Sequence, residues 1–411
     1  MPKTASLLLL TLLLTFILST TRLAAQEPDP LPEVGDRNVH FRGSLDNCRL
    51  RFANEKQGRV AFIGGSITQM NGYRPMTCNL LQELFPETEF TFIDAGISST
   101  CSTTGAFRVE SHVLDHGPID LFFIEFAVND DQDANHPVQQ CTRGMEGIIR
   151  HTRTRYPNAD IVVTYFVNDP MRELRAAGET PLSMQGHEPV VRHYDVSTID
   201  LATEVAQQID KGTLTWQKFG GVHPAPYGNA ICTRMIGHLF DAAWEAPLAA
   251  NATPTPHETP ERLDTFSYDG GRFLSPDKAE HDSEWEWATP PWSELRGSCR
   301  EQFQEEKLLS TETPGATLDL TFEGTAIGAY VLAGPDAGIL EYQVDDLPAG
   351  RVTLYHHYSG GLHYPRTVMF EAELAPGPHT LRLTIASESP PSSKGTAARI
   401  LQFTENVREA E

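Results

Sequence analysis

Short apolar segments alternate with amphipathic segments through the first 246 residues of the chain. Five segments are apolar and rich in β-branched and aromatic residues: 58–64, 89–93, 119–126, 160–166 and 196–201. Between and after them, hydrophobic residues recur at helical spacing in these segments: 73–85, 105–116, 139–155, 202–210 and 228–244. Buried strands that alternate with amphipathic helices are typical of a parallel sheet covered on both faces. The pattern therefore predicts a three-layer α/β domain.

The pattern changes after residue 246. Residues 247–262 are rich in Pro, Ala and Thr, a composition typical of a linker. Beyond them helical periodicity disappears, and Gly and Pro turns separate five β-rich segments: 316–322, 327–332, 339–344, 367–373 and 379–385. These features predict an antiparallel β-sandwich of the jelly-roll type. We expect the α/β domain over residues 26–246 and the sandwich over residues 263–411.

The first residues have the pattern of a secretory signal peptide. Lys3 precedes an apolar run over residues 6–18, and small residues lead to Ala24 and Ala25. The run is shorter than the roughly 20 apolar residues that a membrane-spanning helix needs. We expect residues 1–25 to be removed, leaving a secreted or periplasmic protein that is not held in a membrane. An uncleaved membrane anchor is the alternative.

Charge and cysteine content narrow the classes of partner and cofactor. Asp and Glu number 55 against 32 Lys and Arg, and the net charge of −23 repels nucleic acid phosphates and anionic membranes. We therefore expect no nucleic acid partner. None of the six cysteines has Cys-x-x-Cys spacing or lies beside paired histidines, so no metal site is expected. Cys101 and Cys141 are the one candidate disulfide pair.

Motifs whose residues are suited to catalysis follow three of the predicted strands. They are Gly64-Gly65-Ser66, Asp94-Ala95-Gly96 and Asn129-Asp130. Ligands gather at the carboxyl ends of parallel strands, so these motifs are expected to lie close together. A serine hydroxyl there can attack a carbonyl, while backbone N–H groups and an Asn amide can stabilise the resulting oxyanion. Each motif taken singly is equally compatible with an ordinary turn.

A histidine lies far downstream, in Gly220-Gly221-Val222-His223-Pro224, just before the last predicted helix of the α/β domain. From there His223 can act as the general base for Ser66. Taken singly, a surface histidine is the alternative.

The four motifs in this order resemble those of the SGNH (GDSL-like) hydrolase superfamily, over residues 58–244. The resemblance implies an SGNH-type fold with Ser66 as nucleophile and His223 as base. It also implies an oxyanion hole made by the N–H groups of Ser66 and Gly96 and the amide of Asn129, with no metal or organic cofactor. Together with secretion and the appended sandwich, it implies an esterase that removes acetyl or other small acyl groups from oligo- or polysaccharides.

The chain departs from the family's usual motifs at two glycines. Gly65 stands in place of the Asp in Gly-Asp-Ser, and Gly220 stands where the family usually has an Asp that orients the histidine. The expected constellation is therefore a dyad. Its histidine would be oriented by a main-chain carbonyl or by a carboxylate from another loop, for which the candidates are Asp130, Asp133 and Glu188.

Two alternatives to an esterase remain open at this point. The missing aspartate and the acidic cluster Asp130, Asp131 and Asp133 keep open a hydrolase of another glycan bond, such as a glycosidic one. A catalytically silent glycan-binding protein is the second.

Other polar residues near the motifs are candidates for substrate contacts or for structural pairing. The candidates for substrate binding are Tyr73, Arg74, Asp130 and His187. Glu125 lies inside an apolar strand, where a carboxylate must be paired or neutral. We expect it to pair with Arg74 or Arg108.

Overall fold

The computed structural model describes residues 30–31 and 33–408, so the expected signal peptide lies outside the described residues. From Glu33 onward the described chain belongs to one compact unit. None of its described helices has the length and hydrophobicity needed to span a bilayer.

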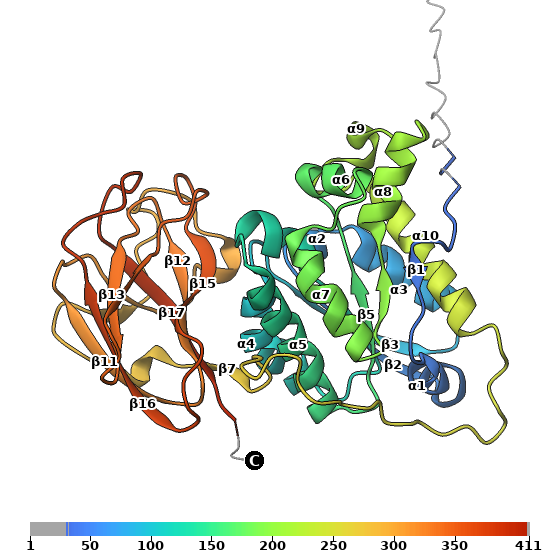
Figure 1. Ribbon diagram of the computed structural model, residues 1–411, viewed down its shortest axis with the longest axis horizontal. Coiled ribbons are helices and arrows are strands. Elements are labelled where there is room, and N and C mark those ends of the chain that lie inside the picture. Colours follow the sequence, from blue (N-terminus) through green and yellow to red (C-terminus); the bar gives the residue numbers. More distant parts are fainter. Residues whose placement is uncertain (1–29, 32, 409–411) are drawn as a thin grey trace, which may run out of the picture. The chain divides into compact units, whose positions relative to one another are not determined.

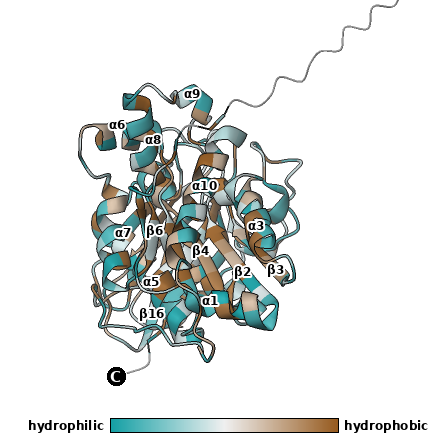
Figure 2. Cartoon of the chain, turned by 90° about the vertical axis from the view of Figure 1, so that its right-hand side faces the viewer, coloured by the Kyte–Doolittle hydropathy of each residue, from teal (hydrophilic) through white to brown (hydrophobic). Residues whose placement is uncertain are grey.

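A six-stranded sheet with the order β1-β6-β5-β4-β2-β3 organises the first part of the chain. Its parallel strands are β2 (Gln57–Gly64), β3 (Glu89–Gly96), β4 (Leu121–Glu125), β5 (Asp160–Thr164) and β6 (Ser197–Ile199). The short β1 (Val39–His40) pairs with β6 in the antiparallel direction. Every residue of β4 and β5 is buried, and hydrophobic residues concentrate on the central strands (Figure 2). The predicted parallel α/β fold is confirmed.

Helices cover both faces of this sheet (Figure 1). One face carries α4 (Ser102–His112), α5 (Val138–Arg155) and α7 (Leu182–His193), and the other carries α3 (Tyr73–Leu84) and α10 (Pro226–Ala243). The remaining helices are α1 (Asp46–Leu50), α2 (Ser66–Gln69), α6 (Asp169–Ala176), α8 (Leu201–Asp210) and α9 (Trp216–Phe219). Short π-helical turns lie at Arg51–Glu55 and Asn129–Asp133, and a 3-10 turn lies at Leu114–His116.

Two antiparallel sheets form the C-terminal part, as the alternating pattern predicts. One has the order β15-β12-β17-β10-β9, with β7 also paired to β17, and the other has the order β14-β13-β16-β11-β8. The first comprises β7 (Gly271–Leu274), β9 (Glu286–Ala288), β10 (Leu308–Thr311), β12 (Ile327–Ala333), β15 (Tyr364–Glu371) and β17 (Ala398–Asn406). The second comprises β8 (Glu280–His281), β11 (Thr317–Glu323), β13 (Ile339–Val344), β14 (Gly350–Thr353) and β16 (Pro378–Ile385). Leucine, valine, isoleucine and phenylalanine side chains from both sheets form its core.

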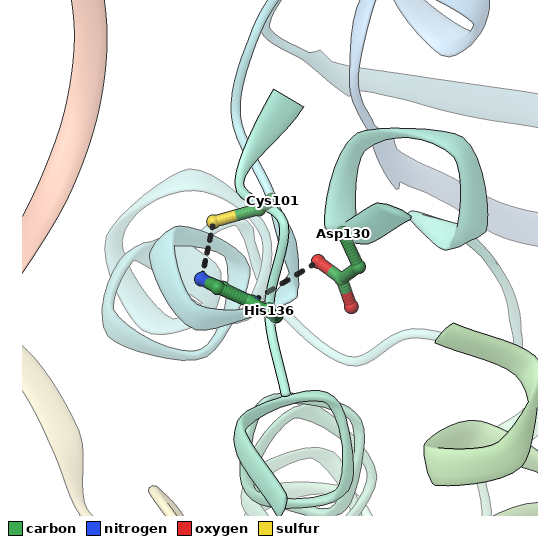
Figure 3. A group of neighbouring side chains, drawn as sticks. All are labelled: Cys101, Asp130 and His136. Atoms are coloured by element: carbon green, nitrogen blue, oxygen red, sulfur yellow. Dashed lines mark hydrogen bonds and ion pairs between the residues drawn. The ribbon is translucent and has the colours of Figure 1, made fainter. Parts of the chain in front are cut away.

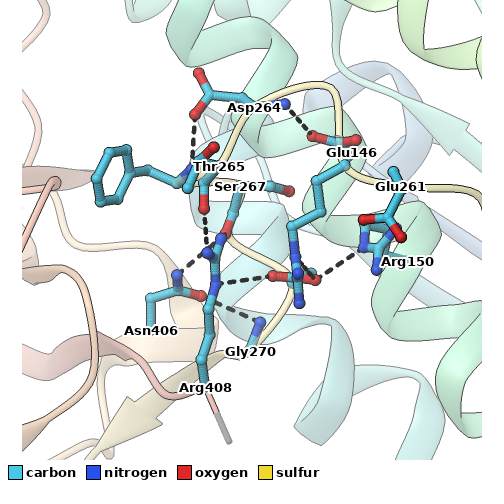
Figure 4. Close-up of polar contacts among 12 residues, drawn as sticks. Glu146, Arg150, Glu261, Asp264, Thr265, Ser267, Gly270, Asn406 and Arg408 are labelled. Carbon is cyan, nitrogen blue, oxygen red and sulfur yellow. Dashed lines mark hydrogen bonds and ion pairs between the residues drawn. The ribbon is translucent and has the colours of Figure 1, made fainter. Parts of the chain in front are cut away.

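The segment 247–262 contains no helix or strand, yet it is bound along the α/β domain. His257 Nε2 lies 2.7 Å from Asp160 Oδ1, and the N–H of Thr255 donates to Asn47 Oδ1 at 2.8 Å. Figure 4 shows the chain after this segment, where Glu146 accepts a hydrogen bond from the N–H of Asp264 at 3.1 Å. The linker-like composition therefore gives irregular structure, but the hydrogen bonds hold it in place.

Candidate active site

Ser66 lies where β2 ends and the short helix α2 begins. As the first residue of α2, it has a main-chain N–H without a partner inside the helix. The preceding Gly65 is required by close packing, because a Cβ at this position would lie 2.0 Å from Asn129 Oδ1. The departure from Gly-Asp-Ser therefore has a steric reason, since in this chain the Asn129 amide fills the space beside residue 65.

The structure brings His223 to Ser66. His223 lies in the loop between α9 and α10, and its Nε2 is 2.7 Å from Ser66 Oγ. Ser66 is partly exposed and His223 is exposed, so a substrate can reach both side chains. In the neutral tautomer protonated at Nδ1, Nε2 accepts the hydrogen bond from the serine hydroxyl, as a general base must.

Gly220 cannot be replaced by an aspartate in this backbone. It ends α9 in the left-handed region with φ +108°, and a Cβ there would lie 1.9 Å from the main-chain nitrogen of Ala225. Within residues 33–408, no carboxylate or carbonyl forms a hydrogen bond or ion pair with the Nδ1 of His223. Ser66 and His223 therefore form a hydrogen-bonded pair without a third partner among the described residues.

The three carboxylates that the sequence offered as orienting groups are bound elsewhere. Asp130 Oδ2 lies 2.7 Å from His187 Nε2, Asp133 Oδ2 accepts a hydrogen bond from Asn129 at 2.6 Å, and Glu188 Oε1 pairs with Arg42 at 2.7 Å. None of them contacts His223, so these candidates are wrong.

The two other expected oxyanion donors have well-defined partners. Asn129 begins the π-helical turn after β4, and its bond to Asp133 uses one of its two amide hydrogens, while its Oδ1 packs against Gly65. The N–H of Gly96, at the end of β3, donates to Asp94 Oδ1 at 3.0 Å. A Cβ on Gly96 would lie 2.4 Å from the nitrogen of Gln69, so this glycine allows β3 to pack against α2.

Most of the expected substrate contacts are internal. Tyr73, Asp130 and His187 have no exposed surface, so they cannot reach a substrate in this structure. Tyr73 instead lies 3.1 Å from Thr68 through its hydroxyl and helps to hold α2. Arg74 is partly buried and pairs with Asp94 at 2.7 Å, which places it below the Gly96 turn.

Glu125 is also buried, but the expected pairing with arginine is wrong. Its carboxyl accepts a hydrogen bond from Thr68 Oγ1 at 3.3 Å, whereas Arg108 donates to the main-chain oxygens of Ala95 and Gly64. Burial raises the pKa of Glu125 to about 8, so the carboxyl stays protonated at neutral pH.

Side chains with metal-ligating atoms gather beside the site in two overlapping groups: Cys101, Asp130 and His136, and Asp130, Cys141 and His187. The carboxylate oxygens of Asp130 accept hydrogen bonds from the N–H of Ser102 at 2.7 Å and from its hydroxyl at 2.6 Å. Asp130 Oδ2 also lies 2.7 Å from His187 Nε2. Hydrogen bonds therefore link the side chains of these two groups around Asp130. All six cysteines are free thiols, so the candidate disulfide between Cys101 and Cys141 is not formed.

The sandwich contacts three loops of the site, which the sequence did not predict. Arg300 donates to Ser98 O at 3.2 Å and to Ser99 Oγ at 2.7 Å, and Ser99 has a positive φ of 73°. His356 Nε2 lies 2.7 Å from the main-chain oxygen of Asp133, and Gln69 donates to Gln302 Oε1 at 2.7 Å. No local sequence signal marks these contacts, because they join residues more than 200 positions apart.

A family model matches part of the first domain. Residues 62–231 match the model of the GDSL-like Lipase/Acylhydrolase family. This segment is similar to that family. The match includes Ser66, Gly96, Asn129 and His223, so the GDSL-like domain is a serine esterase of the SGNH type. No curated protein sequence matches the chain.

Solved structures extend the likeness beyond the GDSL-like domain. A two-domain esterase (CEX) active on acetylated mannans, co-crystallized with mannopentaose, is 18% identical with a TM-score of 0.74, covering 92% of this chain and 100% of that chain. A second structure of a two-domain esterase (CEX) active on acetylated mannans matches with a TM-score of 0.71. The acetylxylan esterase Axe2 from Geobacillus stearothermophilus is 19% identical, with a TM-score of 0.36 over 44% of this chain and 93% of that chain. The first two show that the complete two-part fold is shared.

Proposed function

We propose that the chain is a secreted esterase that removes acetyl or other small acyl groups from carbohydrate through an acyl-enzyme at Ser66. The observation that carries the proposal is the 2.7 Å contact between His223 Nε2 and Ser66 Oγ, both open to solvent. The fold shared with an esterase active on acetylated mannans supports a carbohydrate substrate. The signal-peptide pattern in residues 1–25 and the net charge of −23 support secretion and a substrate other than nucleic acid.

The geometry supports a two-step acyl transfer. Ser66 Oγ attacks the ester carbonyl carbon while His223 Nε2 takes the hydroxyl proton. The oxyanion accepts hydrogen bonds from the N–H of Ser66 and the free amide hydrogen of Asn129. Gly96 is the third donor if its N–H is released from Asp94. His223 then protonates the leaving sugar oxygen, and the acyl group remains on Ser66.

The second step regenerates the serine. A water molecule attacks the acyl-enzyme carbonyl while His223 again takes the proton, and the acid is released as Ser66 regains its hydrogen. Because no carboxylate among residues 33–408 contacts Nδ1 of His223, the imidazolium that forms in each step lacks a carboxylate's stabilisation on that side. We therefore expect slower turnover than in a triad with an aspartate in place.

A panel of acetylated mannans, xylans and small acetyl esters tests this function with wild type, Ser66→Ala and, as a matched control, Ser293→Ala at an exposed serine. We expect acetate release by the wild type and the control, and a loss on the order of 10³-fold or more in Ser66→Ala. A serine-reactive phosphonate should label Ser66. New reducing ends in place of acetate would favour glycosidic cleavage, and binding without turnover would favour the silent glycan-binding protein.

A further inference from the structure

Figure 3 shows His136 between a cysteine, Cys101, and a carboxylate, Asp130. Cys101 Sγ lies 3.9 Å from His136 Nε2, and His136 Nδ1 lies 3.7 Å from Asp130 Oδ1. The bonds from Ser102 and His187 fix Asp130, which has no exposed surface. In this order an imidazole can take the thiol proton and be stabilised by the carboxylate behind it. Ester hydrolysis at Ser66 uses neither Cys101 nor His136.

The position of Cys101 in the fold also favours the thiolate. Cys101 is the residue before α4, an 11-residue helix, so its side chain lies at the positive end of the helix. Its sulfur is 3.6 Å from Thr104 Oγ1, which can donate to an anion. Burial opposes ionisation, but His136 outweighs it, so the pKa of the Cys101 thiol lies below its ordinary value. Arg366, on β15, interacts electrostatically with both Cys101 and His136, and Arg108 interacts with Cys101.

The sulfur is buried from bulk solvent but has space in front of it. The side chain of Cys101 is 5% exposed and lines a cavity of about 210 Å³, whose wall also includes His136, Tyr364 and Arg366. The wall thus contains one nucleophile with a base and a cation. A cavity of this volume has room for a small reagent.

The other cysteines lack this environment. Burial raises the pKa of the thiols of Cys48, Cys141 and Cys232. Cys78 and Cys299 are more exposed, but burial of their sulfurs raises each pKa to about 11, and no histidine contacts them. Solvent exposure of the cysteines and activation of their thiols therefore predict opposite orders of alkylation rate. If exposure decides, Cys78 and Cys299 react first, and if activation decides, Cys101 does.

We propose that Cys101 is an activated thiol and a site of covalent modification by small electrophiles and hydroperoxides. With a hydroperoxide, the thiolate sulfur attacks the terminal oxygen and the O–O bond breaks. Cys101 becomes a sulfenic acid, and the departing alkoxide takes the proton from the His136 imidazolium. The sulfur loses two electrons, which reduce the peroxide to an alcohol, so the step balances. Ester hydrolysis is not needed for this reaction.

Iodoacetamide labelling of the folded full chain at pH 7, followed by peptide mass spectrometry, tests the proposal. We expect Cys101 to be alkylated at least tenfold faster than Cys78 and Cys299. His136→Asn should slow labelling of Cys101 at least tenfold. His151→Asn is a matched control, because His151 is equally buried (15% against 14% side-chain exposure) and has an acidic neighbour but no cysteine contact. Faster labelling of Cys78 or Cys299, or an unchanged rate in folded His136→Asn, would overturn it.

Two further measurements keep the proposal testable if His136→Asn does not fold. The rate of Cys101 labelling in the wild type, followed against pH, should reach half its maximum at a lower pH than the rate at Cys78, and the reverse order would refute an activated thiol. Hydrogen peroxide with dimedone should label Cys101 as a sulfenic acid. If a chelator raises the labelling rate tenfold, the cluster binds a metal and the proposal is wrong.

Discussion

Two glycines allow close packing at the candidate active site because they have no side chain. A side chain at residue 65 would collide with Asn129, and one at residue 220 would collide with the main chain at Ala225. The contact between Ser66 and His223 could be expected from sequence because each residue stands at a fixed place relative to a predicted strand or helix. The hydrogen bonds of Asp130 and the burial of Tyr73 could not be predicted from sequence, because a single sequence does not show which way a polar side chain points.

Restoring the family's aspartate should damage the protein. Gly220→Asp combines a left-handed φ of 108° with a Cβ placed 1.9 Å from Ala225, so we expect a loss of about 3 kcal/mol or more in the free energy of unfolding. Gly221→Asp is the matched control, because Gly221 also has a positive φ but nothing within 4 Å of its Cβ position, and should cost about 1–2 kcal/mol. Denaturant unfolding measures both. A Gly220→Asp variant with full stability and faster turnover would contradict this reading.

Asn129→Ala should lower kcat by about 10²–10³ with little change in KM, because the amide bonds the oxyanion more strongly than the ground-state carbonyl. Steady-state kinetics on a soluble acetyl ester give both parameters. Gln132→Ala, in the same π-helical turn, serves as the control. If KM rises while kcat holds, Asn129 binds substrate and is not an oxyanion donor.

Glu125 should make the protein less stable as the pH rises. Its folded pKa of about 8 lies above its ordinary value of 4.5, so between these values the folded state holds a proton that the unfolded state has lost. The free energy of unfolding then falls with increasing pH, by at most about 1.4 kcal/mol per pH unit. Glu125→Gln should remove this fall. Denaturant unfolding at pH 5 and pH 8 checks it, with exposed Glu87→Gln as control, and an equal pH dependence in Glu125→Gln and wild type would disprove it.

At the scale of elements, the long periodic segments were predictable and the short or interrupted ones were not. Residues 168–195, where the sequence pattern did not predict a helix, contain α6 and α7. Pro189 lies inside α7, where a proline is unfavourable for a helix. Asn168 caps the start of α6, but an asparagine at such a position is equally typical of a turn. The central strand β17 was missed, although it pairs with β12, β10 and β7. Pairing between distant strands does not leave a local pattern.

The loop after β3 should depend on the sandwich for its conformation. Arg300 bonds two residues of this loop, and Ser99 keeps a positive φ there, which costs a non-glycine residue roughly 1 kcal/mol. We expect Arg300→Ala to lower kcat about tenfold, with Arg300→Lys intermediate because an ammonium cannot bridge both oxygens as well. The exposed Arg296→Ala is the control. Unchanged kcat in Arg300→Ala would show that the loop holds its shape alone.

At the scale of the whole molecule, the change in composition and periodicity along the sequence predicts two parts. It does not predict how tightly these parts are bound to each other. A Pro- and Thr-rich segment predicts a tether, and nothing in its composition reveals that Thr255 and His257 bind Asn47 and Asp160. The net charge of −23 also does not show which residues form ion pairs between the two parts. One such pair joins Arg143 and Glu373 at 2.6 Å. The domain boundaries therefore stay a prediction, while the contacts argue that the parts work as one unit.

Cutting the linker tests that unit without removing any residue. A protease site inserted after the exposed Ala250 allows the folded protein to be cleaved in solution. Because Arg300, His356 and Gln302 bind the catalytic loops, we expect the halves to co-elute in gel filtration and to keep most activity on a small acetyl ester. Separation in about 1 M salt should then lower this activity, since ion pairs such as that between Arg143 and Glu373 are screened. Halves that separate at low salt, with the N-terminal half fully active on the small ester, would show that the sandwich does not support the catalytic loops.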